Sequence, residues 1–309
     1  REGLFGAPYH IKRNDMAEYT YKKEVSLYLV HSSKQYKLDI SEITFNQRFQ
    51  ETSYPVKTLH NQDFFEGSVI NRARPADFDF TVPLLQEERN KVVYDRLLDI
   101  DTFDLYISTQ QDDFKLEKCV IIDGVFEINR SKPLSLTVSG EASKLSKFTG
   151  TIPGVAQNTS ITTSTYIVPK PTTVDLGGVD ISSSVTSLSV QLDNDISWTK
   201  YNTVQGGLTA TNAATSMYPT SFTAGTKTLS GSIARYLLKD SPKLFEWSKD
   251  TSLRIKVGSK TPFYGIDLNI SNCSFTNRIE PKNVFSESYD WRMIQNPTTL
   301  SSVLTYNTT

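Results

Sequence analysis

The feature that most constrains this sequence is a short motif that occurs twice, at positions separated by almost half of the chain. Asn-Arg-x-x-Pro spans residues 129–133 and again residues 277–281, 148 positions later in a chain of 309 residues. The surroundings follow the same offset, since Leu105 falls on Leu253. A match that keeps its register through neighbouring segments indicates an internal duplication. The sequence therefore predicts two copies of one domain, and we expect the function to use both.

Composition favours a soluble, globular, strand-rich protein. Hydrophobic residues make up 38% of the chain and charged residues 22%, while Tyr and Phe are plentiful at 15 and 16. The periodic stretches are rich in Val, Ile, Thr and Ser, which favours strands over helices. A formal net charge of −1 argues against a general basic surface for nucleic acid. No apolar run approaches the ~20 residues of a membrane span, and no signal peptide is expected.

The predicted fold class is β-rich α+β, with two tandem domains. Each domain is expected to be an antiparallel sandwich- or barrel-like sheet with one flanking helix and one long loop. The expected order is an N-terminal arm over residues 1–23, a first domain over 24–148, a linker over 149–163 and a second domain over 164–309. Both cysteines, Cys119 and Cys273, occupy apolar strand-like segments and are expected to be buried free thiols rather than a disulfide.

Alternation along the strands predicts a sheet with one apolar and one polar face. Within Asp77–Leu84, every second residue is apolar and the residues between them are mostly polar. The following Gln86–Asp99 segment is typical of a helix, and its Val93, Leu97, Ile100 stripe is expected to pack on the apolar face. A second short helix is predicted at Pro242–Lys249.

Two long stretches, residues 47–76 and 194–227, have no clean hydrophobic period. They occupy equivalent places in the two predicted domains. Irregular segments of this length are unusual inside compact domains and are usually functional or disordered. Both are therefore predicted to be long loops.

No pattern of residues predicts catalysis, a metal site or a cofactor. The three histidines are far apart, and phosphate-binding, dinucleotide-binding and nucleophile-elbow motifs are absent. The Asp193-Asn194-Asp195 run lacks the remaining ligands of a calcium loop and favours a turn. Four acids could form a catalytic pair, but their spacing is better explained by a solvated polar sheet face: Asp77, Asp79, Asp123 and Glu127.

Short runs and strand pairs stand at matching places in the two predicted copies. Asp39-Ile40-Ser41 precedes the first long stretch, Asp180-Ile181-Ser182 precedes the second, and Leu-Ser-Gly-Ser-Ile at 229–233 closes it. Cys119–Glu141 and Tyr264–Trp291 are similar to the closing strand pair of each domain. This arrangement resembles the tail tube domain of long-tailed phages, and most closely the two-domain tail tube proteins of T-five-like siphophages. The resemblance covers roughly residues 24–148 and 164–300.

This resemblance implies a structural virion protein without enzymatic activity, the major tail protein of a siphovirus. Three copies are expected to form a pseudo-hexameric ring, and the rings to stack into the tube that conducts the genome during ejection. The implied partners are other copies of the chain, the tape measure protein in the lumen, phage DNA in transit, and the tail terminator and distal tail proteins at the ends. No cofactor and no membrane are implied, and assembly is expected in the host cytoplasm.

Two sets of residues are expected to serve this role. An acidic, hydroxyl-rich lumen offers no cation to neutralise DNA phosphates, so DNA can pass without sticking. The candidate lumen residues are Asp79, Thr81, Asp123, Glu127, Ser135, Thr137, Ser189, Gln191, Ser230 and Ser232. The long stretches are expected to contact stacked rings or neighbouring subunits, with candidates Tyr54, His60, Phe64, Phe65, Tyr201 and Tyr218.

Other classes of function stay open at this point. One is another virion part with the same fold, such as a tail terminator, a distal tail protein or an adaptor ring. The other is a two-domain carbohydrate- or cell-surface-binding module, which would explain the Ser and Thr content and the lack of catalytic motifs. A module of this kind does not explain two long stretches at equivalent places.

Overall fold

The structure is a computed structural model that describes residues 25–55, 66–129, 132–157, 159, 163–199, 207, 216–239, 251–259, 261–281, 283–295 and 297–309. Nearly all of its elements are strands. In chain order they are β1 (Ser26–His31), β2 (Lys34–Leu38), β3 (Glu42–Pro55), β4 (Glu66–Pro83), η2 (Glu88–Asn90), α1 (Lys91–Asp99), β5 (Phe103–Ser108), β6 (Asp113–Ile128), β7 (Ser135–Ala142), β8 (Lys144–Phe148), β9 (Val155–Ala156), β10 (Lys170–Leu176), β11 (Val179–Asp180), η3 (Ser182–Ser184), β12 (Val185–Trp198), β13 (Phe222–Tyr236), β14 (Thr251–Gly258), β15 (Gly265–Glu280), β16 (Ser286–Met293), η4 (Leu300–Ser302) and β17 (Leu304–Asn307). The predicted β-rich class is confirmed.

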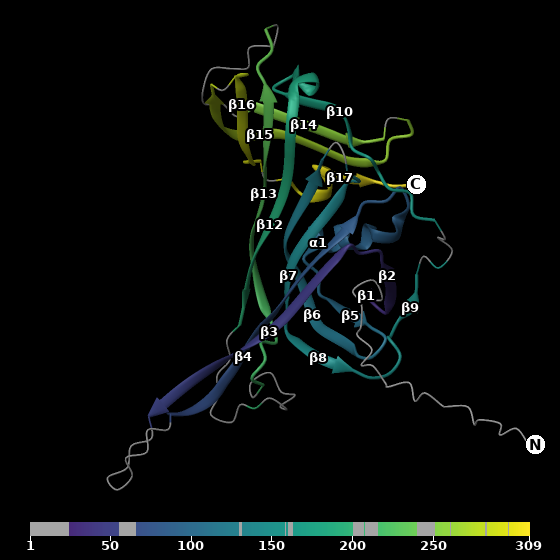
Figure 1. Cartoon of the computed structure of the whole chain (residues 1–309), viewed down its shortest axis with the longest axis vertical. Coiled ribbons are helices and arrows are strands. Elements are labelled where there is room, and N and C mark those ends of the chain that lie inside the picture. Colours follow the sequence, from purple (N-terminus) through teal and green to yellow (C-terminus); the bar gives the residue numbers. More distant parts are fainter. Residues whose placement is uncertain are drawn as a thin grey trace, which may run out of the picture.

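One large antiparallel sheet runs through the whole molecule (Figure 1). Its strand order is β3-β4-β7-β6-β12-β13-β16-β15. Two smaller sheets branch from it, because the long strands β6 and β15 each continue into a second layer. The first has the order β2-β1-β5-β6-β8, and the second has the order β11-β10-β14-β15-β17.

The pairing pattern of β1–β8 recurs in β10–β17, strand for strand. We call β1–β9 the first half and β10–β17 the second half. The two cysteines mark equivalent positions, since Cys119 and Cys273 each follow a bulge in the long strand of their half. Both are buried free thiols, as predicted. The boundaries of two separate domains stay a prediction.

The motif that first suggested the duplication does not occupy equivalent places. Asn129 follows the end of β6, whereas Asn277 lies inside β15 opposite Tyr289. The equivalent positions are Glu127, opposite Ser135, and Glu280, opposite Ser286. The offset between the halves therefore changes with each bulge and loop, and the five-residue match is not part of the structural repeat.

The helix α1 covers the apolar face of the large sheet in the first half, as predicted. Val93 and Leu97 are fully buried, and α1 packs against β6. Gly124 on β6 allows this close approach, because a Cβ at that position would lie 2.3 Å from Leu97 Cδ2. The helix begins at Lys91, after a short 3-10 turn, instead of at Gln86. The second predicted helix, at 242–249, lies outside the described residues.

The two long stretches were wrongly predicted to be loops over much of their length. β3 extends to Pro55 and β4 begins at Glu66, so the first stretch is mostly a long hairpin. In the second, β12 continues to Trp198 and β13 starts at Phe222. Figure 1 shows β3 and β4 leaving the body as a two-stranded ribbon, which we call the arm (residues 49–55 and 66–72). Both faces of such a ribbon meet solvent, so its sequence has no reason to alternate.

The C-terminal strand β17 belongs to the second half but bonds the first half. The Tyr94 hydroxyl of α1 donates to Leu304 O at 2.5 Å. The backbone amide of Leu85 donates to the Tyr306 hydroxyl at 2.7 Å, and that hydroxyl donates to Leu85 O. Tyr94, Leu85 and Tyr306 are all buried. These contacts, which we call the tyrosine latch, hold the halves together at a place away from their shared sheet.

The second half has a buried ion pair where the first half has two aliphatic side chains. Arg235 opposes Glu287 in the pairing of β13 with β16, and Val82 opposes Leu136 at the equivalent place in β4 and β7. Arg235 is only 1% exposed, and its Nη2 lies 2.8 Å from Glu287 Oε2. Asn277 Nδ2 donates to the other carboxylate oxygen at 2.6 Å. Hydrogen bonds on both oxygens compensate the desolvation of this carboxylate.

Candidate functional site

The structure brings all ten candidate lumen residues onto one face of the large sheet. Thr81 opposes Thr137 and Glu127 opposes Ser135 in the first half; Ser189 opposes Ser232 and Gln191 opposes Ser230 in the second. Ser189 also opposes Glu127, which makes the face continuous across the two halves. Asp79 and Asp123 lie on the same face, two and four residues from Thr81 and Glu127. Residues of the opposite parity, such as Phe80, Phe126 and Val190, are buried.

Side-chain hydrogen bonds cross this face from strand to strand. The Thr81 and Thr137 hydroxyls lie 2.9 Å apart, and Thr137 donates to Glu127 Oε1 at 3.2 Å. In the second half the Ser189 and Ser232 hydroxyls also lie 2.9 Å apart. Hydroxyl groups that bond one another in this way keep short side chains in place, so the face is a polar surface with fixed groups.

The expected absence of cations from this face holds only in the first half. Strands β4, β6 and β7 carry no Lys or Arg on the polar face between residues 77 and 83, 120 and 128, and 135 and 142. In the second half, Arg292 opposes Ser230 and Arg278 opposes Ser288, which places both guanidinium groups on the polar side. Arg278 forms an ion pair with Glu280 at 3.2 Å. The face is therefore acidic in one half and mixed in the other.

The seam between the halves is the pairing of β12 with β6, from Leu188 opposite Ile128 to Asp193 opposite Asp123. At the end of the seam where Asp193 opposes Asp123, the two carboxylates face each other. Gln191 Nε2 donates to Asp123 Oδ1 at 3.2 Å and to Asp193 Oδ1 at 2.9 Å. Burial, followed by the contact with Asp193, raises the pKa of Asp123 to about 6. This carboxyl group is consequently half-protonated near pH 6.

The two outer strands of the large sheet each leave an edge that no described strand covers. β3 pairs only with β4 among the described strands, and residues 274–280 of β15 pair only with β16. Ile279 on this part of β15 is 50% exposed, although it shares its parity with buried Cys273. On β3, Phe45 shares the parity of the core face and packs on Phe114, with ring centroids 5.5 Å apart. The sequence did not predict either edge. The available signal was Ile279, an apolar residue in the alternating register of β15.

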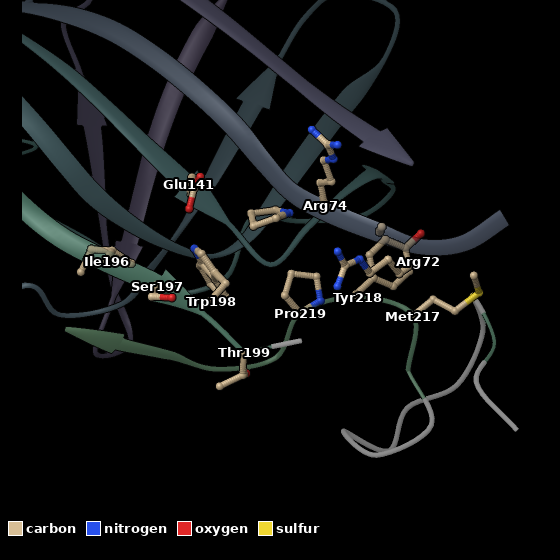
Figure 2. Close-up of a pocket in the computed structure, with 12 residues that line it drawn as sticks. Arg72, Arg74, Glu141, Ile196, Ser197, Trp198, Thr199, Met217, Tyr218 and Pro219 are labelled. Carbon is tan, nitrogen blue, oxygen red and sulfur yellow. The ribbon is translucent and has the colours of Figure 1, made fainter. Parts of the chain in front are cut away.

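In the second half, residues 217–220, which lead into β13, lie on the first half. Ala73 N donates to Met217 O at 2.9 Å, Ser143 Oγ donates to Pro219 O at 2.5 Å, and Lys118 Nζ donates to Thr220 O at 3.2 Å. Lys144 Nζ lies over the Tyr218 ring, 5.1 Å from its centroid. A cavity of about 370 Å³ remains beside these contacts. Figure 2 shows it, lined by Arg72, Arg74, Glu141, Trp198 and Tyr218 among others.

The structure describes two of the six candidate contact residues, Tyr218 and Tyr54. Tyr218 lies at the junction just described, where its ring also meets Phe49 edge-on at 6.4 Å. Tyr54 lies on the arm and is 47% exposed. The others lie outside the described residues: His60, Phe64, Phe65 and Tyr201.

The described residues offer little basis for chemistry. Within them, no group of three or more His, Cys, Asp or Glu side chains could hold a metal ion. Their one α-helix has nine residues, and none of their helices is long and apolar enough to cross a membrane. The features that stand out are surfaces: a polar sheet face, two open strand edges and a projecting arm.

Comparison with known protein families gives a match over most of the chain. The model of the Bacteriophage Baseplate Tube Protein Family matches residues 87–307, which includes parts of both halves. No curated protein sequence matches the chain. The match supports the expected tube protein of a phage tail, and the family it names is that of the baseplate instead of the major tail protein.

Proposed function

We propose, because this chain belongs to the bacteriophage baseplate tube protein family, that three copies close into one ring of the tail tube where it passes through the baseplate. Family membership makes the chain a structural component of a phage tail, which agrees with a non-enzymatic role. The three-copy ring, its place in the baseplate and its partners are our proposal.

The observation that carries this proposal is the seam between the halves. β12 of the second half joins β6 of the first, and the recurring pattern makes β3 the equivalent of β12 and β15 the equivalent of β6. The equivalent seam therefore requires β3 of one copy and β15 of the next. Among the described residues of the single chain, no strand pairs with either of these edges. Open strand edges tend to pair with other strands, and a head-to-tail contact that closes on itself makes a ring.

The side chains on the two open edges match in polarity. Within the chain, buried Val190 opposes buried Phe126. Counted from the equivalent pairs, Phe45 of one copy would oppose half-exposed Ile279 of the next, so an apolar residue again meets an apolar residue. One position away, Thr44 would oppose Glu280 on the polar side. The seam between copies would keep core residues on the core face and polar residues on the polar face.

In the proposed ring the polar face of the large sheet lies on the inside. Each chain supplies two similar units, so three chains supply six and give pseudo-sixfold symmetry. The helix α1 lies on the opposite, apolar face and would face outward. The ten polar candidates would then line the lumen, which holds the tape measure protein before ejection and DNA during it. Rings of tube proteins or terminal proteins would contact its two ends.

Electron microscopy and native mass spectrometry of the purified protein test this proposal. We expect a trimer with a central hole. Ile279→Asp places a charge in the seam and should yield monomers that stay folded by circular dichroism. Val155→Asp, at an exposed site outside the strand edges of the large sheet, is the matched control and should still form rings. A monomeric natural chain, or a ring of six chains, would refute the proposal, while long stacked tubes would favour the major tail tube over a single baseplate ring.

A further inference from the structure

One end of the first half is covered by residues that lead into the second half. We call residues 165–167 the cover; they lie between Leu84, which follows β4, and Leu134, which precedes β7. Ile167 N donates to Leu84 O at 3.3 Å, and Leu134 N donates to Ile167 O at 2.8 Å. Ile167 is 1% exposed, and Leu84 and Leu134 are fully buried. The cover thus completes both the hydrogen bonding and the apolar packing at this end.

The second half has the same end, and no described residue covers it. Leu237 N donates to Phe285 O at 2.9 Å. Leu84 N makes the same bond to Leu134 O at 2.8 Å, and each pair lies two positions beyond the buried ion pair or its aliphatic counterpart. Phe285 is nevertheless 53% exposed. Among the described residues, none bonds Phe285 N or Leu237 O, which are the counterparts of the two groups that the cover bonds.

The recurring strand pattern identifies the segment that would cover this end. β10, which follows the cover, is the counterpart of β1. Val174 of β10 opposes Ile255. At the equivalent place, Leu27 of β1 opposes Ile107. The counterpart of the cover is therefore the stretch just before β1, within residues 1–24, which we call the leading segment and which lies outside the described residues.

The two seams assign the leading segment to the adjacent copy. Within the chain, the cover belongs to the half that contributes β12 to the seam, and it lies on the half that contributes β6. Lys170, at the start of β10, and Ile128 of β6 accordingly line one cavity of about 580 Å³. In the proposed ring, β3 takes the place of β12 and β15 takes that of β6. The leading segment of one copy would therefore meet the second half of the adjacent copy.

Sequence spacing places an aromatic residue at this contact. Ile167 lies seven positions before Val174, and one of these positions is a bulge in β10. Six positions before Leu27 stands Tyr21. The chain from Tyr21 to Val25 spans at most about 14 Å. The uncovered end of the same copy lies beside β16, six strand spacings of about 4.8 Å from β3, so Tyr21 can reach the adjacent copy and not its own second half.

We propose that the leading segment of one copy lies on the uncovered end of the second half of the adjacent copy, with Tyr21 against Phe285. Its backbone bonds Phe285 N and Leu237 O, as Ile167 bonds the first half. This proposal rests on the proposed ring, because the seam between copies brings the two surfaces together. The partner is a second copy of this chain, and each contact between copies then has two parts, the strand seam and this second cover.

Photo-cross-linking of the full chain tests the contact. With p-benzoylphenylalanine in place of Tyr21, ultraviolet light should give covalent dimers and trimers on a denaturing gel. Tryptic digestion should place the cross-link on the peptide 283–292, which contains Phe285. The same label in place of Val155, which is 69% exposed and lies outside the large sheet, is the matched control and should remain monomeric on the gel.

Two truncations provide a second readout. Removing residues 1–23 should raise the concentration at which rings dissociate on dilution by about tenfold, since an aromatic contact is lost. Removing residues 1–16 keeps Tyr21 and should leave that concentration unchanged. Equal ring stability of the two truncated chains would overturn the second cover.

The outcomes separate this inference from the proposed function. Rings seen by native mass spectrometry in which position 21 cross-links only within one chain, or to other residues of the adjacent copy, would overturn the second cover and leave the ring proposal standing. Equal cross-linking from position 155 would overturn it in the same way. Absence of any ring from the natural chain would refute the proposed function, and the second cover with it.

Discussion

Asparagine at position 123 should stabilise this protein at neutral pH and have almost no effect in acid. Asp123 faces Asp193 across the seam, Ser139 opposes it on β7, and Gln191 bonds both carboxylates. Since its pKa is raised to about 6 in the folded protein, folding favours its protonated form. An amide keeps the oxygen that accepts from Gln191 and adds donors toward Asp193, without the charge.

The sign and size follow from linkage. A carboxyl group whose folded pKa is raised costs no stability below its unfolded pKa of 3.8, and the cost grows as pH rises to about 6. A difference of about two pKa units corresponds to about 3 kcal/mol as an upper value. The group is only partly buried, so solvent screening reduces this to about 1 kcal/mol. Asp123→Asn should therefore raise the free energy of unfolding by about 1 kcal/mol at pH 8.

Urea unfolding at pH 4 and pH 8, followed by tryptophan fluorescence, checks this expectation. The gain at pH 8 should vanish at pH 4, where the natural carboxyl group is already protonated. Asp79→Asn, on the same polar face but away from the seam, is the control for a general charge effect. Equal stabilisation at both pH values, or a loss at pH 8, would show that the two carboxylates do not oppose folding at the seam.

Three further sets of substitutions test other parts of the structure. Tyr306→Phe removes the acceptor of a buried amide and should lower the free energy of unfolding by about 1–3 kcal/mol, measured by urea titration; unchanged stability would mean that the latch is not closed in solution. Glu287→Ala leaves Arg235 buried beside a lost partner and should cost about 3–5 kcal/mol. The double variant Arg235→Val with Glu287→Leu copies Val82 and Leu136 of the first half and should recover most of that loss. Failure to recover it would mean that the ion pair itself is required. Asp79→Lys with Glu127→Lys should make assembled rings retain duplex DNA at low salt in a filter-binding assay, with retention falling as salt rises; no gain would place this face away from the DNA path.

Alternation and helix periodicity predicted the parts of the fold that have a buried face. The segment 77–84 and the stripe of α1 face the core, so their sequences carry a strict pattern. Among the described residues, nothing buries either face of the arm, so alternation in its sequence does not indicate a strand. The duplication was predicted from a motif that turned out to be out of register, while the recurring strand pairs and the bulges at the two cysteines carry the repeat.

The candidate site was predictable only in part for a similar reason. The polar face follows from parity within each strand, so all ten of its residues could be identified before their partners were known. The two open edges depend on which strands meet across the chain, and no local pattern contains that information. Ile279 was a detectable exception, because an apolar residue at the end of an alternating strand implies a neighbour.

The tyrosine latch has a mechanical consequence for a ring of these chains. Within one chain the halves are fastened twice, by the strand seam and by Tyr94 and Tyr306 on the far side of the core. Two separated fastenings prevent the halves from hinging about their shared sheet. Between copies, the equivalent of the strand seam is present but a chain-internal latch is not. A ring of three such chains would bend at the three contacts between copies and not at the three seams within chains. Any widening to admit a passing molecule would therefore give the ring a triangular outline.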